Sequence, residues 1–245
     1  MLRDDLRGMW FITLKDLRAY YLKPPNVSWG ILFPFAFVLA FVIRGDGSGD
    51  LGGLVPGLLA LTLLFGTTSM EAIVITFERR IGALERLLLA PLRLPALLAG
   101  KLLGGMAFGL VTTAVVLVVA LAVFGVADVR WLLLFGAILF SAAAFSALGA
   151  LVSVAVNEVF EAQTLANAFR FPMMFLGGVF VPLASLPPWL RLVARALPLT
   201  YAVEAMRAAM GSGETSRALL DLLALAAFTA VFFVLASWTL ARRVA

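Results

Sequence analysis

The chain has 245 residues, of which 63% are hydrophobic and 13% charged, whereas a soluble domain carries about 25% charged residues. It contains no histidine and no cysteine, which excludes histidine general bases, cysteine nucleophiles, histidine or thiolate metal sites and disulfides. The formal net charge of +5 is typical of the cytoplasm-facing Lys/Arg excess of membrane proteins and gives no indication of nucleic-acid binding.

The first 26 residues predict an amphipathic helix that lies in the membrane interface. Apolar side chains recur every three or four residues, and basic side chains fall on the opposite face. The apolar set is Leu2, Leu6, Trp10, Leu14, Leu17 and Tyr21, and the basic set is Arg7, Lys15 and Arg18. A soluble helix packed on a partner is the alternative. Because no small-residue cleavage site follows the first apolar run, a signal peptide is not expected.

Six apolar runs predict transmembrane helices and therefore an all-α integral membrane protein with a single transmembrane domain over residues 1–245. The runs cover residues 27–43, 51–77, 96–125, 131–156, 164–183 and 218–241. An even number of spans places both termini on one side. Twelve Lys and Arg then lie on the side of the termini and six on the other, so we expect both termini in the cytoplasm.

The second and third spans are joined by a charged segment, residues 78–91, which predicts a short amphipathic helix. Its charges are Glu78, Arg79, Arg80, Glu85 and Arg86, and its apolar face carries Ile81, Leu84 and Leu88. Such a helix is suited to contact a cytoplasmic partner. A loop helix that only anchors the two spans in the interface explains the composition equally well.

Residues 184–217 contain two helical patterns, Trp189–Leu197 and Leu199–Met210, that are too short to cross the hydrocarbon core. Pro182, Pro187, Pro188 and Pro198 interrupt the segment. We expect a re-entrant helical hairpin that enters the membrane from the outer face and packs against the bundle, because irregular backbone at that depth must be buried in protein or face water.

Two groups of motifs give the chain a specific resemblance to a known family. The first comprises Glu78, Gly82, Leu84, Glu85, Leu87, Leu88 and Pro91, followed by Gly100-Lys101 at the start of the third span. The second comprises Phe171-Pro172, Gly178-Val179-Phe180-Val181-Pro182, Leu186-Pro187-Pro188-Trp189 and Pro198-Leu199-Thr200-Tyr201. In order and position these resemble the signatures of the permease subunits of type-2 ABC exporters, and the resemblance covers the whole chain.

The resemblance implies a permease that forms a homodimer and binds two copies of a separate ATPase subunit. Residues 78–95 would be the coupling helix region, and its partner contacts would be Glu78, Arg79, Arg80, Gly82, Glu85, Arg86, Leu87 and Pro91. The turn 157–163, with Glu158 and Glu161, would touch the same subunit. ATP and Mg²⁺ would belong to that subunit, because Gly100-Lys101 lacks the upstream glycine of a phosphate-binding loop.

Two ionisable residues lie away from the ends of the predicted spans, Glu71 in the second span and Arg170 in the fifth. Their estimated distances from the inner membrane surface match, and pairing offsets part of the cost of burying each charge in a bilayer. We therefore predict an intramembrane salt bridge between Glu71 and Arg170. The alternative is that each faces a watery inner vestibule and touches substrate.

The leading functional hypothesis is an ATP-driven exporter permease of a bacterial-type inner membrane, which is not itself an enzyme. Its substrate would be lipidic, glycolipid or drug-like and hydrophobic. The alternative is an ion-coupled secondary transporter, which requires charged groups near the membrane midplane, whereas most ionisable residues here lie near span ends. An intramembrane enzyme is disfavoured because no span contains paired acids.

Overall fold

The computed structural model describes residues 2–23, 52–90, 92–124, 128–211 and 214–244, together with Leu32 and Ala36. Within these residues all regular secondary structure is helical and there is no strand, which confirms the predicted all-α class. The first predicted span, 27–43, and Pro91 of the charged segment lie outside the described residues.

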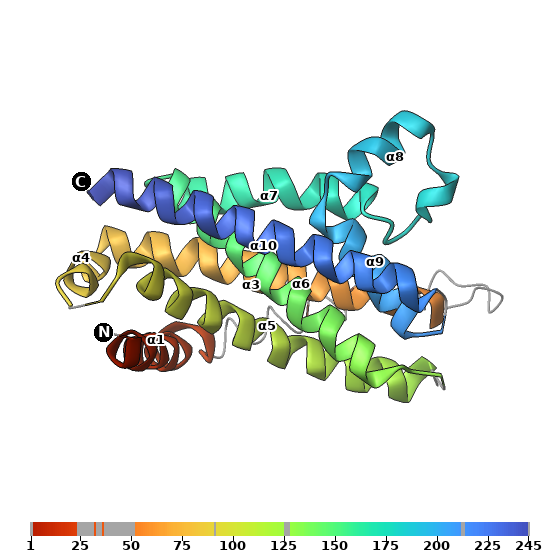
Figure 1. The fold of residues 1–245 in the computed structure, drawn as a ribbon, viewed down its shortest axis with the longest axis horizontal. Coiled ribbons are helices and arrows are strands. Elements are labelled where there is room, and N and C mark those ends of the chain that lie inside the picture. The colour runs from red at the N-terminus through yellow and green to blue at the C-terminus, as the bar shows by residue number, and fades with distance from the viewer. Residues whose placement is uncertain are drawn as a thin grey trace.

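Four long helices form the body of the molecule: α3 (Val55–Arg80), α5 (Leu94–Phe124), α6 (Trp131–Ala155) and α10 (Thr215–Val244). They run side by side along the long axis (Figure 1). Among the described residues, these are the helices long and apolar enough to cross a membrane, over Val55–Arg80, Leu94–Val123, Trp131–Ala155 and Thr215–Arg243. They overlap four of the six predicted spans, and the count of six stays a prediction.

Helix α7 (Val159–Leu176) runs along the same axis but is not among the helices long and apolar enough to cross a membrane (Figure 1). It begins five residues before the predicted span 164–183, because Glu158 and Glu161 form a reciprocal capping box at its N-terminus. It also ends seven residues early. The chain then turns through Gly178, whose φ of 80° lies in the left-handed region that favours glycine.

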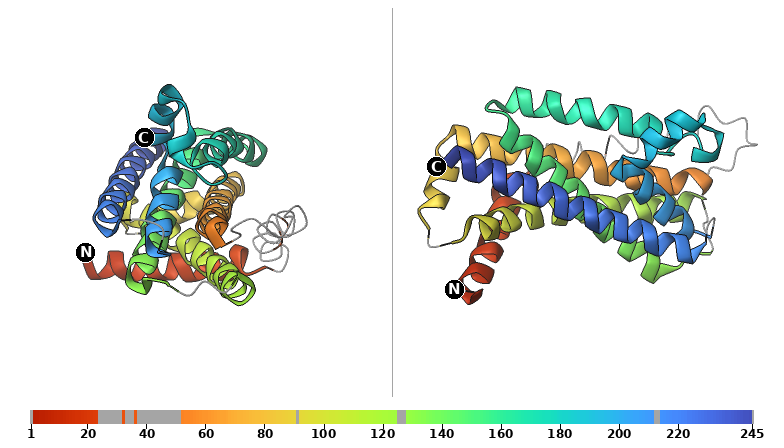
Figure 2. Two further views of the ribbon diagram at one scale, coloured as in Figure 1. Left: turned by 90° about the vertical axis from the view of Figure 1, so that its right-hand side faces the viewer. Right: turned by 45° about the horizontal axis from the view of Figure 1, so that its top comes forward.

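The two ends of the bundle differ. The start of α1, the short helix α4 (Ala83–Leu88) and the end of α10 lie at one end, which we call the coupling end (Figures 1 and 2). At the other end lie the 3₁₀ turn Leu183–Ser185 and helix α8 (Pro188–Arg195), followed by α9 (Pro198–Ala209). Helices α8 and α9 fall on the two short patterns within 184–217, and each begins with the proline that suits a first helical turn.

Helix α1 (Leu2–Asp16) continues into a π-helical turn, Leu17–Tyr21, and runs across the direction of the bundle (Figures 1 and 2). It crosses α5 at Gly100, where an added Cβ would lie 3.0 Å from the Cα of Met9. The side that faces the bundle includes Ile12 and Asp16, and Tyr21 is also buried. The crossing therefore buries two polar side chains of α1, Thr13 and Asp16, which the amphipathic pattern did not single out.

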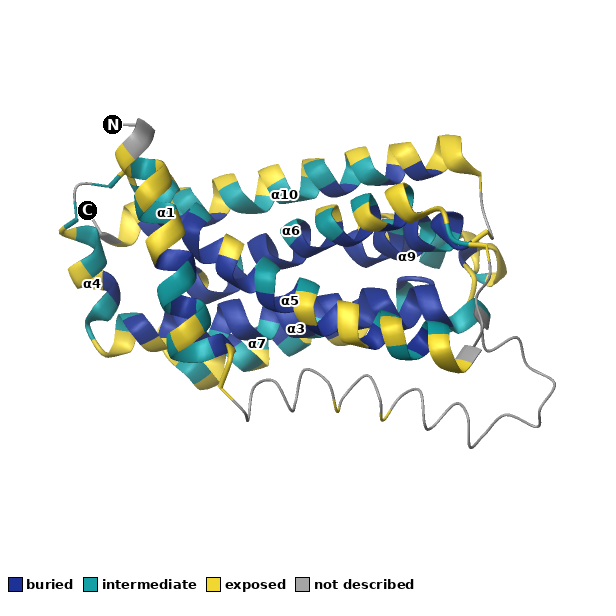
Figure 3. Cartoon of the chain, turned by 90° about the horizontal axis from the view of Figure 1, so that it is seen from below, coloured by how far each residue is buried: buried dark blue, intermediate teal, exposed yellow. Residues whose placement is uncertain are grey.

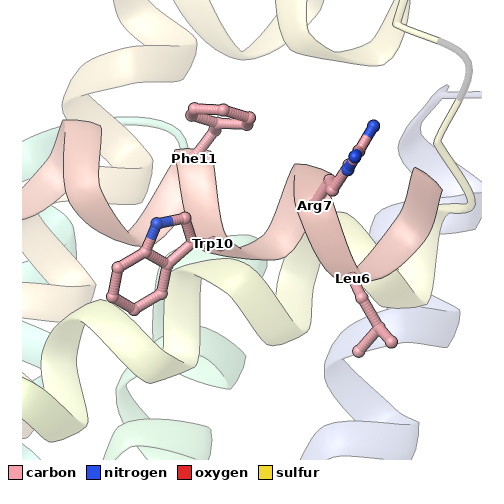
Figure 4. A pocket seen from close by; sticks show the side chains of 4 residues that line it. All are labelled: Leu6, Arg7, Trp10 and Phe11. Atoms are coloured by element: carbon pink, nitrogen blue, oxygen red, sulfur yellow. The ribbon is translucent and has the colours of Figure 1, made fainter. Parts of the chain in front are cut away.

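The opposite side of α1 is exposed (Figure 3). Leu6, Trp10 and Phe11 are each more than half exposed and, with Arg7, line a shallow pocket. Figure 4 shows Leu6 and Trp10 projecting to one side of the helix and Arg7 and Phe11 to the other. Exposed Trp and Leu beside Arg suit headgroup depth, as the sequence predicts for an interfacial helix.

The principal core lies where α3 meets α6 and α9, the dark blue region of Figure 3. Small residues let the helices approach closely: a Cβ added at Gly149 of α6 would lie 2.9 Å from the Cα of Thr68 in α3. Helix α9 buries most of its side chains in this core. Its packing fixes α8 at the end opposite to α4.

Candidate functional site

The charged segment forms a turn and a short helix at the coupling end. Helix α3 ends at Arg80, and Gly82 adopts a φ of 70°, which only glycine adopts without strain, before α4 begins at Ala83. Leu84 is buried and packs in a second apolar cluster with Leu97 and Leu98 of α5. This single anchor fixes which face of α4 points outward.

The outward face of α4 carries the predicted partner residues Glu85 and Arg86, both exposed, and Leu87 is half-buried. Leu89, just past the helix, is 86% exposed, and Ile81 just before it is 51% exposed. An acid, a base and two large apolar side chains thus lie free on one short protrusion. Such a mixture is typical of a surface that binds another protein.

Arginines join this protrusion to the C-terminal end of α6. Arg79 donates from Nη2 to the carbonyls of Ser153 and Val156. Arg243 of α10 donates from Nη2 to the carbonyl of Ala155 at 2.7 Å and from Nη1 to Val156 at 3.3 Å. The last carbonyls of a helix lack intrahelical donors and carry partial negative charge, so cations stabilise them. The same contacts connect α3, α6 and α10.

The turn between α6 and α7 lies next to the protrusion. Arg80 forms an ion pair with Glu158, with 3.1 Å between Nη1 and Oε2, and both side chains are more than half exposed. Glu161 accepts the backbone N–H groups of Asn157 and Glu158, so its carboxylate is occupied in capping α7. Phe160 between them is 83% exposed. This aromatic side chain extends the exposed surface, and the sequence reasoning did not single it out.

Glu78, the first residue of the predicted partner surface, is instead buried. Its Oε1 pairs with Lys15 and its Oε2 with Lys101 of α5. Asp16 pairs with the same two lysines, at 2.7 Å from Lys15 Nζ and 2.8 Å from Lys101 Nζ. We call these four residues the buried tetrad. A direct contact of Glu78 with a partner is therefore excluded in this structure, because no part of its side chain is exposed.

The tetrad is electrically balanced, with two bases and two acids. Burial raises the pKa of Asp16, and the charge of Lys101 only partly counteracts this. Burial alone would lower the pKa of Lys15, but the carboxylates of Asp16 and Glu78 outweigh it and raise the pKa. The charge of Lys15 is thus maintained by its two acidic partners. The sequence reasoning placed Lys15 on the solvent side of α1 and treated Lys101 as part of a motif, so it missed the cluster.

Glu71 lies two helical turns from Glu78, on the same side of α3. Its Oε1 accepts the backbone N–H of Gly105 at 2.9 Å, the hydroxyl of Tyr21 at 3.2 Å and the hydroxyl of Ser146 at 3.3 Å. These donors come from α5, the π-helical turn and α6. A side chain at Gly105 would collide with the Glu71 carboxylate.

The predicted ion pair between Glu71 and Arg170 is not among the ion pairs of the described residues. Arg170 donates from Nη1 to Ser69 and lies 5.1 Å from the centre of the Phe65 ring. Ser69 and Glu71 are two residues apart in α3, hence about 200° apart around its axis. The two charges thus occupy opposite sides of α3, and the matching depth on which the prediction rested does not bring them together.

The side of α3 that faces α7 therefore holds a buried guanidinium. A charge at the centre of a membrane helix costs about 2.5–3.5 kcal/mol on insertion scales. A desolvated cation–π contact offsets about 2 kcal/mol, and the hydroxyl of Ser69 contributes one hydrogen bond.

Comparison with known proteins gives a family for this architecture. A model of the ABC-2 type transporter family matches residues 8–210, which includes α1 from Gly8 onward, the tetrad, α4 and α9. The chain is 25% identical over 214 residues to the inner membrane transport permease YadH of Escherichia coli K12, covering 82% of this chain and 81% of that protein.

A eukaryotic protein is also similar. The ABC transporter G family member 20 of Dictyostelium discoideum is 29% identical over 181 residues, which cover 74% of this chain. The matched region spans 25% of that longer protein.

Proposed function

Because the chain belongs to the ABC-2 type transporter family and is the transmembrane subunit of an ABC transporter, we propose that it is the permease of an ATP-driven exporter. Its substrate is lipidic, glycolipid or drug-like and hydrophobic, and it leaves the cytoplasm or the inner leaflet. The ATPase activity, with ATP and Mg²⁺, belongs to a separate subunit. The permease acts as a homodimer with two ATPase copies.

The observation that carries this proposal is the exposed surface at the coupling end. Glu85, Arg86 and Leu89 point outward from the α4 protrusion, and Phe160 is exposed on the neighbouring turn. The Arg80–Glu158 ion pair links the two parts. In the proposed complex, this surface lies in a cleft of the ATPase subunit. Pro91, outside the described residues, follows the protrusion in sequence and would end it.

The contacts behind this surface support transmission of force. A push on α4 reaches α6 and α10 through Arg79 and Arg243, and it reaches α1 and α5 through the tetrad. Ionic contacts that are buried and mutually paired resist separation, so neighbouring helices move with α4 as a body. ATP-driven closure of the ATPase subunits would thereby shift the two permease bundles relative to each other.

We place the coupling end in the cytoplasm of a bacterial-type cell, with the chain crossing the inner membrane six times. Both described ends of the chain, and most of the basic residues counted for the inner side, belong to this end. The α8–α9 hairpin then lies at the outer face, where it contributes to the exit of the substrate.

Charge exchange on α4 tests the proposal. The variant Glu85→Arg/Arg86→Glu keeps the net charge and should abolish stimulation of the co-expressed ATPase by substrate while leaving membrane insertion intact. The control is Glu214→Arg/Arg217→Glu, an exposed acid–base pair 3.2 Å apart before and in the first turn of α10. Unchanged stimulation in the α4 variant, with the ATPase still bound, would show that this surface is not the coupling site.

A further inference from the structure

In the proposed six-span topology, Arg170 lies near the middle of the fifth span. It is eleven residues beyond Val159, the first residue of α7, hence about 16 Å along the helix. Its partner Ser69 is likewise eleven residues from Arg80, the last residue of α3. The two helices thus place the guanidinium at equal depth by independent counts.

The guanidinium of Arg170 has more N–H donors than the described residues around it have acceptors for them. Only 1% of Arg170 is exposed, and Nη1 donates to Ser69. Among the described residues, neither Nε nor Nη2 has an acceptor. Nearly all buried polar groups in proteins are hydrogen-bonded, so two unpaired N–H donors on one buried cation indicate a function beyond packing.

Among the described residues, no acid forms an ion pair with Arg170. Glu71, the acid nearest in depth, is on the far side of α3 and accepts from Gly105, Tyr21 and Ser146. The stretch 24–45, which contains the first predicted span, has no Asp or Glu in its sequence. The described residues thus leave Nε and Nη2 of Arg170 open to an acceptor from outside the chain.

Aromatic side chains surround the cation. Phe65 lies against the guanidinium, and the Phe65 and Phe171 rings meet edge to face with centroids 6.3 Å apart. Phe169, Phe171 and Phe175 of α7 are all partly exposed. A fixed positive charge beside an apolar aromatic surface is complementary to an anionic headgroup that carries an apolar tail.

Helix α7 also has a weak point beside Arg170. Pro172 lies inside the helix and lacks the N–H that would bond to the carbonyl four residues earlier. Prolines are the usual cause of sharp bends in helices. A bend here would move the guanidinium away from Ser69 and uncover its free donors.

We propose that Arg170 binds the anionic headgroup of the transported amphiphile, a carboxylate or phosphate, while the phenylalanines of α7 and Phe65 contact its tail. This names the substrate class and rests on the proposed function. Arg170 is a binding residue here, and its guanidinium offers the two parallel N–H donors that carboxylates and phosphates accept in a bidentate manner.

The test measures binding of laurate and of dodecanol, which share a tail and differ in headgroup charge, to the full-length chain in nanodiscs by equilibrium dialysis. Empty nanodiscs correct for partition into lipid. The wild type should prefer laurate by about tenfold or more, the value of one charge-assisted hydrogen bond. Arg170→Gln should bind both probes equally, with dodecanol binding unchanged. The matched control is Arg195→Gln, which removes an exposed positive charge on α8 and should keep the preference.

Two results would overturn the proposal: a wild type without preference for laurate, or an Arg170→Gln variant that retains the preference. If Arg170→Gln does not fold, the same binding measurement on Arg170→Lys tests the proposal, because this variant keeps the charge and loses the planar pair of donors. It should retain a reduced preference, and an unreduced one counts against the assignment. No ATPase is present in the assay, so its outcome is independent of the coupling test on Glu85 and Arg86.

Discussion

Replacing Lys101 with methionine should destabilise the protein strongly, because it removes the one fully buried base of the tetrad. Lys101 pairs with Glu78 and with Asp16, at 2.8 Å from the latter, and none of these three side chains is exposed. In the variant, two buried carboxylates share Lys15, whose side chain is 39% exposed. The balanced cluster then carries one uncompensated buried negative charge.

The expected cost is about 3–5 kcal/mol of unfolding free energy, the usual result when one partner of a buried ion pair is removed. Methionine fills a similar volume, so the loss reports on charge and not on a cavity. The second variant Lys101→Met/Glu78→Gln restores balance between Lys15 and Asp16. It should recover at least about 1 kcal/mol relative to Lys101→Met alone, as expected for coupled neighbours.

Unfolding by sodium dodecyl sulfate in mixed micelles, followed by tryptophan fluorescence, measures these free energies. The loss in Lys101→Met should also shrink on acidification. Burial raises the pKa of Asp16, and Lys101 is the main group that counteracts this rise. Without Lys101 the folded variant therefore takes up a proton at a higher pH than the wild type does, and it regains stability as the pH falls through that pKa. A loss below about 1 kcal/mol, or a double variant no better than the single one, would refute the tetrad as a coupled unit.

Three further predictions concern other parts of the chain. The losses of unfolding free energy for Glu71→Gln and Arg170→Gln should add within about 0.5 kcal/mol in the double variant, because the two groups share no partner. A larger coupling energy would show that Glu71 and Arg170 do form an ion pair. Gly82→Ala should cost about 1–2 kcal/mol, measured by the same unfolding assay, because its φ of 70° strains a residue with a Cβ; a neutral effect would mean that the turn relaxes freely. Ser185→Cys, the sole cysteine in the resulting chain, should react with an impermeant thiol reagent from outside intact cells, and labelling only from the cytoplasm would invert the proposed topology.

The sequence could predict elements whose cause is local. Long apolar runs require helices, and Pro188 and Pro198 mark the starts of two short ones. The charged segment predicts a short helix after the second span, and α4 lies there, although it begins only after a turn at Gly82. The exposure of Glu85 and Arg86 could also be predicted. Leu84 is on the apolar side of the same short helix and must face the bundle, so the charged side faces outward.

The charge partners could not be predicted in the same way. Distance from the helix end gives the depth of a residue in the membrane, but the side of the helix it occupies depends on which neighbour packs there. Glu71 and Arg170 matched in depth and differed in side. The amphipathic pattern of α1 gave no sign that Asp16 is buried. Its burial depends on the crossing of α1 and α5 at Gly100, a contact between segments far apart in the sequence.

The central claim is that the α4 end of the molecule binds a separate ATPase subunit, and site-specific photocrosslinking in cells tests it most directly. A photoreactive side chain at Leu89, 86% exposed at the coupling end, is compared with one at Leu132, 89% exposed near the start of α6 at the other end of the bundle. Crosslinks from position 89 to a protein with a phosphate-binding loop, and none to that protein from position 132, are the predicted result. The same ATPase captured from position 132 and not from position 89 would contradict the account.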